Sequence, residues 1–503
     1  MTTRIRLAVV FTLVAALSLG VLAAADKLSS AAARTQTEIA DILYDHADYW
    51  TAMRLYLRAT ECDDQAVRDV AHAGAVRSAL RVAEFPLAVT HLAALRTQGS
   101  HDPVMLALAG DTLWASGRFD EAETAYTDAA AIEPGNPRAR HGLAKALASK
   151  NQLARALDEV QAALRVAPTD SDLQHTLGSI YERMHRYSDA ASAYTTYLSG
   201  LRTRDRGDKI RWARSHVGFL RSFDGTVPFE MIARNGVRRH VLDFRLVNGK
   251  VMIKAKVNGS KAVEFALDTG AEHSALSEAT ARKLRILPWT ETLSAGAGMF
   301  GMRGLQVGKL ESLEIGTLTI KNLPCLIKSP SVRDLPTDGT EAFSPLELGL
   351  SVSVDYRNRR VTLGEPVVDD TPALELPLRL NRLATVSGGV NGNPVSFIVD
   401  TGGEAISLNT STARTLFTPA DRHRIKLNVY GASGFDPEAY LLPGVNLAFG
   451  SVTMNNQPVV VLDLRAPSVL LGYEIGGIIG YRFLGRYHVD FDLQRSVLRL
   501  RDL

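Results

Sequence analysis

The sequence predicts a multidomain chain in which an all-α solenoid is followed by an all-β domain of two similar lobes. Three observations carry this prediction. Small and large residues recur at a fixed spacing in the N-terminal third, apolar and polar residues alternate through the C-terminal half, and that half contains two copies of one unit. The chain has 503 residues, which is room for about three domains.

The repeats are defined by small residues spaced 34 positions apart and by large residues four positions after them. The small residues let two helices cross closely, and the large ones fill the space between helices. This spacing resembles the tetratricopeptide repeat, and a general α-solenoid is the alternative because the tryptophan of that repeat is absent. The small set is Ala88, Ala122, Ala156 and Ala190, the large set is Leu92, Tyr126, Val160 and Tyr194, and Pro134 and Pro168 mark turns.

The repeat domain is expected to cover residues 36–201, and a linker helix is expected over 202–237. Three units between Asp102 and Leu201 are clear, and two earlier units are degenerate, as terminal capping repeats often are. The repeats contain no recognisable nucleophile, carboxylate pair or metal cluster. We therefore expect them to recruit a substrate or protein partner and to be dispensable for the chemistry.

The β-rich half is predicted to form two lobes, 238–366 and 372–503. Each lobe has an Asn-Gly turn, then an apolar run that ends in Asp-Thr-Gly, and each closes on Val-Asp followed by an aromatic residue. One Asp-Thr-Gly is weak evidence, whereas two copies in matching contexts indicate a duplicated functional unit. The matching segments are 257–259 and 390–392, 265–270 and 397–402, and 354–356 and 489–491.

The two Asp-Thr-Gly segments predict a pair of carboxylates, Asp268 and Asp400. An apolar strand would deliver each aspartate to a loop in a nearly dry cleft. There the threonine can hydrogen-bond to the other loop, and the glycine lets backbone approach the carboxylate. Two carboxylates this close do not both ionise easily, so they share one proton. The ionised member can act as a general base on water, and the protonated member can polarise a carbonyl.

These segments resemble the catalytic loops of the retropepsin-like aspartic peptidases, in particular the exported bacterial ones. The resemblance extends from about Val241 to Leu503. It implies a pepsin- or retropepsin-like two-lobed fold and an aspartic endopeptidase acting on polypeptides, with Asp268 and Asp400 as catalytic residues and with no metal or cofactor. The supporting loop residues are Thr269, Gly270 and Ala271 in the first lobe and Thr401, Gly402 and Gly403 in the second.

The family's second signature, two apolar residues and a glycine beneath the catalytic loop, is matched by residues 478–480. The first lobe lacks that glycine at the corresponding place, 343–345, and Gly403 replaces the alanine of the catalytic loop. These departures favour the alternative of a catalytically degenerate peptidase fold that serves as a binding or scaffold protein. Another alternative is a homodimer in which each lobe pairs with the same lobe of a second chain.

Glycine-rich segments downstream of each aspartate are candidates for the hairpin flaps that cover substrate in this family. Gly296, Gly298 and Gly301 also spell Gly-x-Gly-x-x-Gly, but no helical pattern follows them, so a dinucleotide site is not predicted. Gly431 and Gly434 are the candidates in the second lobe. An ordinary flexible loop is the alternative for both segments.

The N-terminus has the pattern of an export signal. Arg4 and Arg6 precede an uncharged run from Leu7 to Ala25, which ends in three alanines. The run is also just long enough to span a bilayer if it is not cleaved, and a buried helix is the alternative. We therefore expect residues 1–25 to be a signal peptide or membrane anchor. The protein is expected to be periplasmic or tethered to the outer face of the inner membrane.

Composition indicates which classes of partner and cofactor are not expected. The net charge of +3 and the lack of like-charge blocks give no indication of nucleic-acid binding. Cys62 and Cys325 are expected to be buried free thiols, and no metal-binding motif is recognisable. Glu272 and His273, beside the first catalytic loop, are expected to be surface residues rather than catalysts.

Overall fold

The structure, a computed structural model, describes residues 28–95, 101–202, 205, 207–296, 301–328, 341–366, 373–418, 424–431 and 434–503. The chain divides into two compact units, Met1–His101 with Arg202–Asp205 and Asp102–Leu201 with Arg206–Leu503. The predicted signal or anchor at 1–25 lies outside the described residues, among which no helix is both long and apolar enough to cross a membrane. The second of the two compact units contains the three clear repeats and both β lobes.

Consecutive pairs of helices form the predicted solenoid. The fixed small residue on the second helix of each pair is fully buried, as at Ala122 and Ala156. This confirms the all-α repeat fold. The pairs are α2 (Ser30–Asp45) with α3 (Tyr49–Ala59) and α4 (Gln65–Arg81) with α5 (Phe85–Ala94) in the first unit, and α6 (Pro103–Ala115) with α7 (Phe119–Ile132), α8 (Pro137–Ser149) with α9 (Leu153–Val166) and α10 (Ser171–Arg183) with α11 (Tyr187–Gly200) in the second.

Small residues are needed where an aromatic ring fills the space between helix pairs. Gly110 of α6 and Gly142 of α8 lie against the ring of Tyr126 on α7. A Cβ atom would be 2.6 Å from that ring at Gly110 and 2.2 Å at Gly142, both far inside normal contact. Tyr126 is fully buried, and its hydroxyl donates to Asp111 Oδ1 over 2.7 Å. Close packing of this kind explains why small residues recur along the repeats.

The first β lobe is built on one nine-stranded sheet. Its order is β1-β9-β6-β10-β5-β4-β8-β7, with β3 paired to β4. Short β10 lies between β5, to which it is parallel, and β6, to which it is antiparallel. The strands are β1 (Glu230–Ala233), β3 (Arg245–Val247), β4 (Lys250–Val257), β5 (Val263–Leu267), β6 (Ala275–Ser277), β7 (Pro288–Ala295), β8 (Met302–Ile315), β9 (Leu318–Lys328) and β10 (Glu341–Phe343).

The second lobe repeats this plan within a thirteen-stranded sheet. In both lobes a short strand lies parallel to the strand that ends at the aspartate: β10 beside β5, and β22 beside β15. The strands of the second lobe are β14 (Leu383–Val390), β15 (Asn393–Val399), β16 (Ile406–Asn409), β17 (Ile425–Lys426), β20 (Tyr440–Phe449), β21 (Val452–Leu462) and β22 (Gly477–Ile479), and a separate hairpin pairs β18 (Val429–Gly431) with β19 (Gly434–Asp436).

Strands from both lobes join in the remainder of the thirteen-stranded sheet. The order there is β13-β24-β23-β11-β12-β2, with β23 and β11 at the centre. In that central pair Val354 lies opposite Val489, and these are equivalent residues of the duplicated unit. The two lobes are therefore related by an approximate twofold axis at this point. The strands are β2 (Arg239–Asp243), β11 (Ser351–Asp355), β12 (Arg360–Gly364), β13 (Leu374–Asn381), β23 (Tyr487–Asp492) and β24 (Val497–Asp502).

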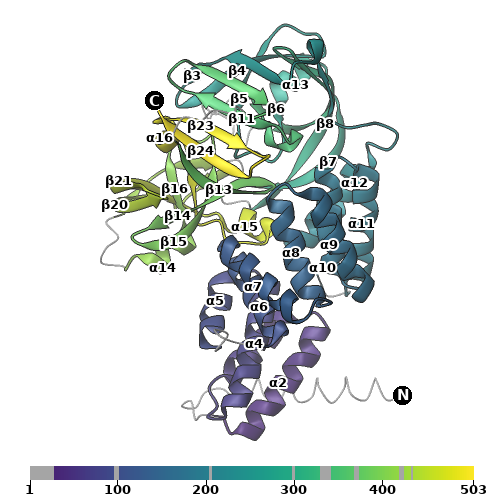
Figure 1. The fold of residues 1–503 in the computed structure, drawn as a ribbon, viewed down its shortest axis with the longest axis vertical. Helices are drawn as coiled ribbons and strands as arrows, with labels where there is room; N and C mark the ends of the chain where they lie inside the picture. The colour runs from purple at the N-terminus through teal and green to yellow at the C-terminus, as the bar shows by residue number, and fades with distance from the viewer. Residues whose placement is uncertain are drawn as a thin grey trace. The chain divides into compact units, whose positions relative to one another are not determined.

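The expected linker, 202–237, contains elements that pack on the repeats and on the first β lobe. Helix α12 (Asp208–Arg221) packs on α11 and along β7 of the first lobe (Figure 1). Strand β1 lies in the same range and pairs with β9. The buried side chains of Trp212 and Leu220 belong to one continuous core with Phe265 and Phe343 of the first lobe.

The turns within the repeats also contact the second lobe. Trp114 and Phe119, at the turn between α6 and α7, share a buried cluster with Tyr473, whose ring lies 5.0 Å from that of Phe119. The backbone N–H of Glu474 donates to Ala115 O over 2.7 Å. Because the repeats and the lobes share buried apolar surface, the packing argues against the expectation that the helical region is dispensable.

The unit boundary predicts how shorter fragments behave. A fragment of residues 102–503 keeps the core whole, and we expect one cooperative transition in urea by circular dichroism. A fragment of residues 223–503 loses α12, including Trp212 and Leu220, and exposes the apolar surface that they cover. It should aggregate or unfold without cooperativity. A soluble 223–503 fragment with a sharp transition would contradict the shared core.

Candidate active site

Both predicted aspartates stand at the same place in their lobes, directly after an apolar strand. Asp268 follows β5, and its backbone N–H donates to Phe343 O over 2.9 Å. Asp400 follows β15, and its backbone N–H donates to Ile479 O over 3.0 Å. The short parallel strand therefore fixes the start of each loop, and the two carboxyl groups begin from equivalent positions.

The two loops are joined by crossed hydrogen bonds between their threonines. The Thr401 hydroxyl accepts from Thr269 N–H over 3.2 Å and donates to Leu267 O over 2.6 Å. The Thr269 hydroxyl accepts from Thr401 N–H over 3.0 Å and donates to Val399 O over 2.7 Å. Both threonines are fully buried. Each side chain thus satisfies a buried donor and a buried acceptor of the other lobe.

The glycines let each loop approach the opposite carboxyl group. A Cβ atom at Gly270 would lie 2.4 Å from Asp400 Cγ, and one at Gly402 would lie 2.7 Å from Asp268 Cγ. Any side chain at either position would displace the opposite aspartate. Both loops come from one chain, which favours a pair within the chain over the alternative in which each lobe pairs with the same lobe of another chain.

Backbone donors and the neighbouring charge act on the pKa of Asp400 in opposite directions. Asp268 Oδ1 accepts from Gly270 N–H over 3.0 Å, and Asp400 Oδ1 accepts from Gly402 N–H over 2.8 Å and Gly403 N–H over 3.0 Å. Burial and the charge of Asp268 outweigh these donors and raise the pKa of Asp400 above its ordinary value. Both aspartates keep partial exposure, so solvent reaches the pair.

The two departures from the family pattern fit the loop geometry. A Cβ atom at Gly403 would lie 2.8 Å from Asp400 Oδ2, so glycine relieves contact there. At Gly480 a Cβ atom would lie 2.5 Å from Gly403 O. Ser344 occupies the equivalent place in the first lobe, and its hydroxyl donates to Ala271 O over 2.7 Å. The missing glycine is thus replaced by a hydrogen bond.

The described candidate flap residues lie where the strands of two hairpins end or begin. Gly296 and Gly301 flank the tip of the β7–β8 hairpin, and Gly298 lies outside the described residues. Gly431 ends β18 and Gly434 begins β19, opposite each other. A Cβ atom at Gly301 would be 4.0 Å from Ala466 Cβ in α15 (Arg465–Leu471), so the hairpin of the first lobe reaches the second.

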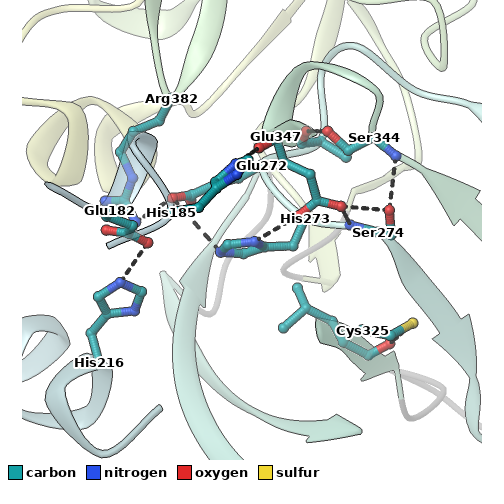
Figure 2. A network of polar contacts seen from close by, with 12 residues as sticks. Glu182, His185, His216, Glu272, His273, Ser274, Cys325, Ser344, Glu347 and Arg382 are labelled. Atoms are coloured by element: carbon teal, nitrogen blue, oxygen red, sulfur yellow. Dashed lines mark hydrogen bonds and ion pairs between the residues drawn. The ribbon is translucent and has the colours of Figure 1, made fainter. Parts of the chain in front are cut away.

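The expectation that His273 is a surface residue is wrong, whereas the side chain of Glu272 keeps 31% exposure. Glu272 forms an ion pair with Arg382, and the side chain of His273 is only 15% exposed. His273 Nδ1 lies 3.1 Å from Glu347 Oε2 in a network that also includes Glu182 of α10 (Figure 2). Among the residues that the structure describes, no three potential ligands gather as they would around a metal ion.

This network carries no signature in the sequence because its members come from distant elements. The guanidinium of Arg382 lies 4.1 Å above the ring of Trp212 on α12. The carboxyl group of Glu182 on α10 is 2.8 Å from Nε2 of His216, which lies on α12 like Trp212. Helices α10 and α12 therefore reach the network beside the first catalytic loop, although no spacing in the chain indicates it.

Comparison with known proteins agrees with this architecture. A family model described as aspartyl protease matches residues 253–352 and 386–483, one match in each lobe. A tetratricopeptide repeat model matches residues 113–180. The chain carries tetratricopeptide repeats and a two-lobed aspartyl protease domain. The expected retropepsin-like fold after an N-terminal repeat region is thereby confirmed.

Two solved structures are similar to part of this chain. A thermophilic TPR protein of Thermus thermophilus is 16% identical, with a TM-score of 0.32 over 38% of this chain and 98% of that chain. The pilF protein of Pseudomonas aeruginosa is 15% identical, with a TM-score of 0.28 over 39% of this chain and 86% of that chain. No curated protein matches the chain.

The crossed threonine bonds predict a stability loss specific to the lobe contact. Thr401→Val keeps the shape of the side chain but leaves Thr269 N–H and Leu267 O unpaired. We expect the free energy of unfolding in urea to fall by about 1–3 kcal/mol. Thr112→Val is the matched control, because that buried hydroxyl donates only to Leu108 O within α6, and it should cost about 1 kcal/mol or less. Equal losses in both variants would contradict a special role for the crossed bonds.

Proposed function

We propose that the protein is an aspartic endopeptidase in which Asp268 and Asp400 activate water. The observation that carries the proposal is the contact of the two aspartate loops inside one chain, with each glycine against the opposite carboxyl group. Two carboxyl groups held this close raise the free energy of the ionised pair, which a purely structural contact would avoid. A raised pKa in a partly exposed position is typical of a functional site.

In the proposed reaction, Asp400 holds the proton that the pair shares, because burial and the charge of Asp268 raise the pKa of Asp400. A water molecule between them gives a proton to Asp268 while its oxygen bonds to the peptide carbonyl carbon. Asp400 donates its hydrogen bond to the carbonyl oxygen. The C–N bond then breaks as the proton on Asp268 passes to the leaving nitrogen. The substrate forms no covalent bond to the protein at any step.

The substrate class is polypeptide, and the two glycine-tipped hairpins are the proposed flaps. Tetratricopeptide repeats suggest contact with a protein, but the turn side of the later repeats is occupied by the lobes. There Ser496 Oγ donates to Lys150 O over 2.6 Å, and Glu474 N–H bonds to Ala115 O. A partner would therefore use other faces of the repeats.

Substituting either aspartate tests the proposal. Asp268→Asn and Asp400→Asn should each abolish cleavage of an unstructured peptide, and the double variant should be no worse because the pair acts as a unit. In the wild type the rate should fall as the pH rises through the raised pKa of Asp400, since the shared proton is then lost.

Urea transitions of the same variants are the control for folding. Substantial cleavage by either folded single variant would contradict a shared site. A folded wild type that binds peptides and cleaves none would support the binding or scaffold alternative instead.

We further propose that the protein works outside the cytoplasm, either periplasmic or anchored by its first 25 residues. The motivation is the pattern of Arg4 and Arg6 followed by an uncharged apolar run. Alkaline phosphatase, which needs an oxidising compartment, should be active when fused after Ala25, and a cytoplasmic reporter fused there should be silent. The reverse result would overturn export, and N-terminal sequencing would distinguish signal from anchor.

A further inference from the structure

Three equivalent positions beneath the catalytic loops are polar in the first lobe and apolar in the second. They are the sixth residue after the aspartate and the first and fourth residues after the short parallel strand. The first lobe has Ser274, Ser344 and Glu347 there, and the second has Ile406, Gly480 and Phe483. Ser274 and Ser344 are fully buried, and the Glu347 side chain is 4% exposed.

Glu347 is the centre of the polar set. Its Oε1 accepts from Ser274 N–H over 2.9 Å and from the Ser274 hydroxyl over 2.6 Å (Figure 2). Its Oε2 lies 3.1 Å from His273 Nδ1. Burial lowers the pKa of His273, but the bond to Glu347 and the nearby carboxylates raise it overall. A buried carboxylate needs such donors, and here they all come from the segment that follows the catalytic loop.

The hydrogen bonds continue from Glu347 into the loop itself. Ser274 Oγ accepts from Ser344 N–H over 3.1 Å. The Ser344 hydroxyl then donates to Ala271 O over 2.7 Å. Ala271 is the third residue after Asp268, so two serines connect Glu347 to the loop that carries the first aspartate.

A proline explains why the first lobe needs this connection. In the second lobe the backbone N–H of Tyr481 donates to Gly403 O over 2.9 Å and closes the catalytic loop. Pro345 stands at the place of Tyr481 in the first lobe, and proline has no N–H. The equivalent carbonyl, Ala271 O, must be satisfied by another donor, and the Ser344 hydroxyl is that donor.

We propose that Glu347 is a positioning residue for the first catalytic loop. Through Ser274 and Ser344 it holds Ala271 O and thereby keeps the Asp268 carboxyl group facing Asp400. The effect on reaction rate rests on the proposed peptidase function, whereas the effect on loop mobility does not. This role requires a hydrogen-bond acceptor such as the Glu347 carboxylate, because an apolar residue such as Phe483, which stands at the equivalent position of the second lobe, cannot orient a serine hydroxyl.

The experiment compares three variants of the full chain. Glu347→Leu removes the acceptor and should lower kcat about 10- to 100-fold while KM changes by less than about threefold. Glu347→Gln keeps an oxygen that accepts from Ser274 and should retain kcat within about threefold. Glu341→Leu is the matched control, since Glu341 is also a buried carboxylate but accepts from Ser277 and Thr280 instead. It should lower Tm and leave kcat of the folded protein unchanged.

Amide hydrogen exchange gives a readout that needs no activity. Glu347→Leu should speed exchange of residues 268–274 at least about tenfold and leave residues 400–406 unchanged, because local opening becomes easier in one lobe only. If Glu347→Leu does not fold, Ser344→Ala takes its place, since it removes only the hydroxyl bonded to Ala271 O. Glu341→Leu should not alter exchange in either loop.

Several results would overturn the proposal. They are unchanged exchange at 268–274 in the folded variant, faster exchange with wild-type kcat, a KM change that accounts for the whole loss, or the same kcat loss in Glu341→Leu. If the wild type cleaves no peptide, the proposed function fails, and the exchange result alone decides whether Glu347 positions the loop.

Discussion

The crossed hydrogen bonds between Thr269 and Thr401 are the interaction on which the rest of the site depends. Each threonine satisfies an amide and a carbonyl that belong to the other lobe, so neither loop can complete its hydrogen bonding alone. Once the loops are crossed, Gly270 and Gly402 necessarily lie against the opposite carboxyl groups. The closeness of Asp268 and Asp400 is a consequence of this contact, and burial together with the charge of Asp268 raises the pKa of Asp400.

The lobes meet one geometric constraint with different chemistry. Both must hold a loop carbonyl three residues after the aspartate, Ala271 O or Gly403 O. The second lobe uses the backbone N–H of Tyr481, which the preceding glycine allows to come close. The first lobe has proline in place of Tyr481 and uses a serine hydroxyl supported by Glu347. Duplicated units can thus diverge in sequence at a shared contact as long as the same atom stays satisfied.

The later repeats are part of the same folded body as the lobes. Helix α12 covers β7, one strand of the candidate flap hairpin, and the turns of the repeats bond to the second lobe. His185, on the turn after α10, lies 3.4 Å from Glu347 O, next to the set that supports the first loop. A conformational change in these helices would therefore act on residues adjoining the proposed site, without any separate linker.

The sequence by itself determined the repeats, the duplicated β lobes and the pair of aspartate loops. These features are visible because they are local or periodic: a spacing set by helix packing, an alternation set by the pleat, and a short motif that must recur wherever the loop recurs. Only the tertiary structure decided that the repeats share a core with the lobes, that the His273 side chain is mostly buried, and that Ser344 compensates for Pro345. Those facts depend on contacts between residues far apart in the chain, and no local pattern records which distant side chain will satisfy a buried polar group.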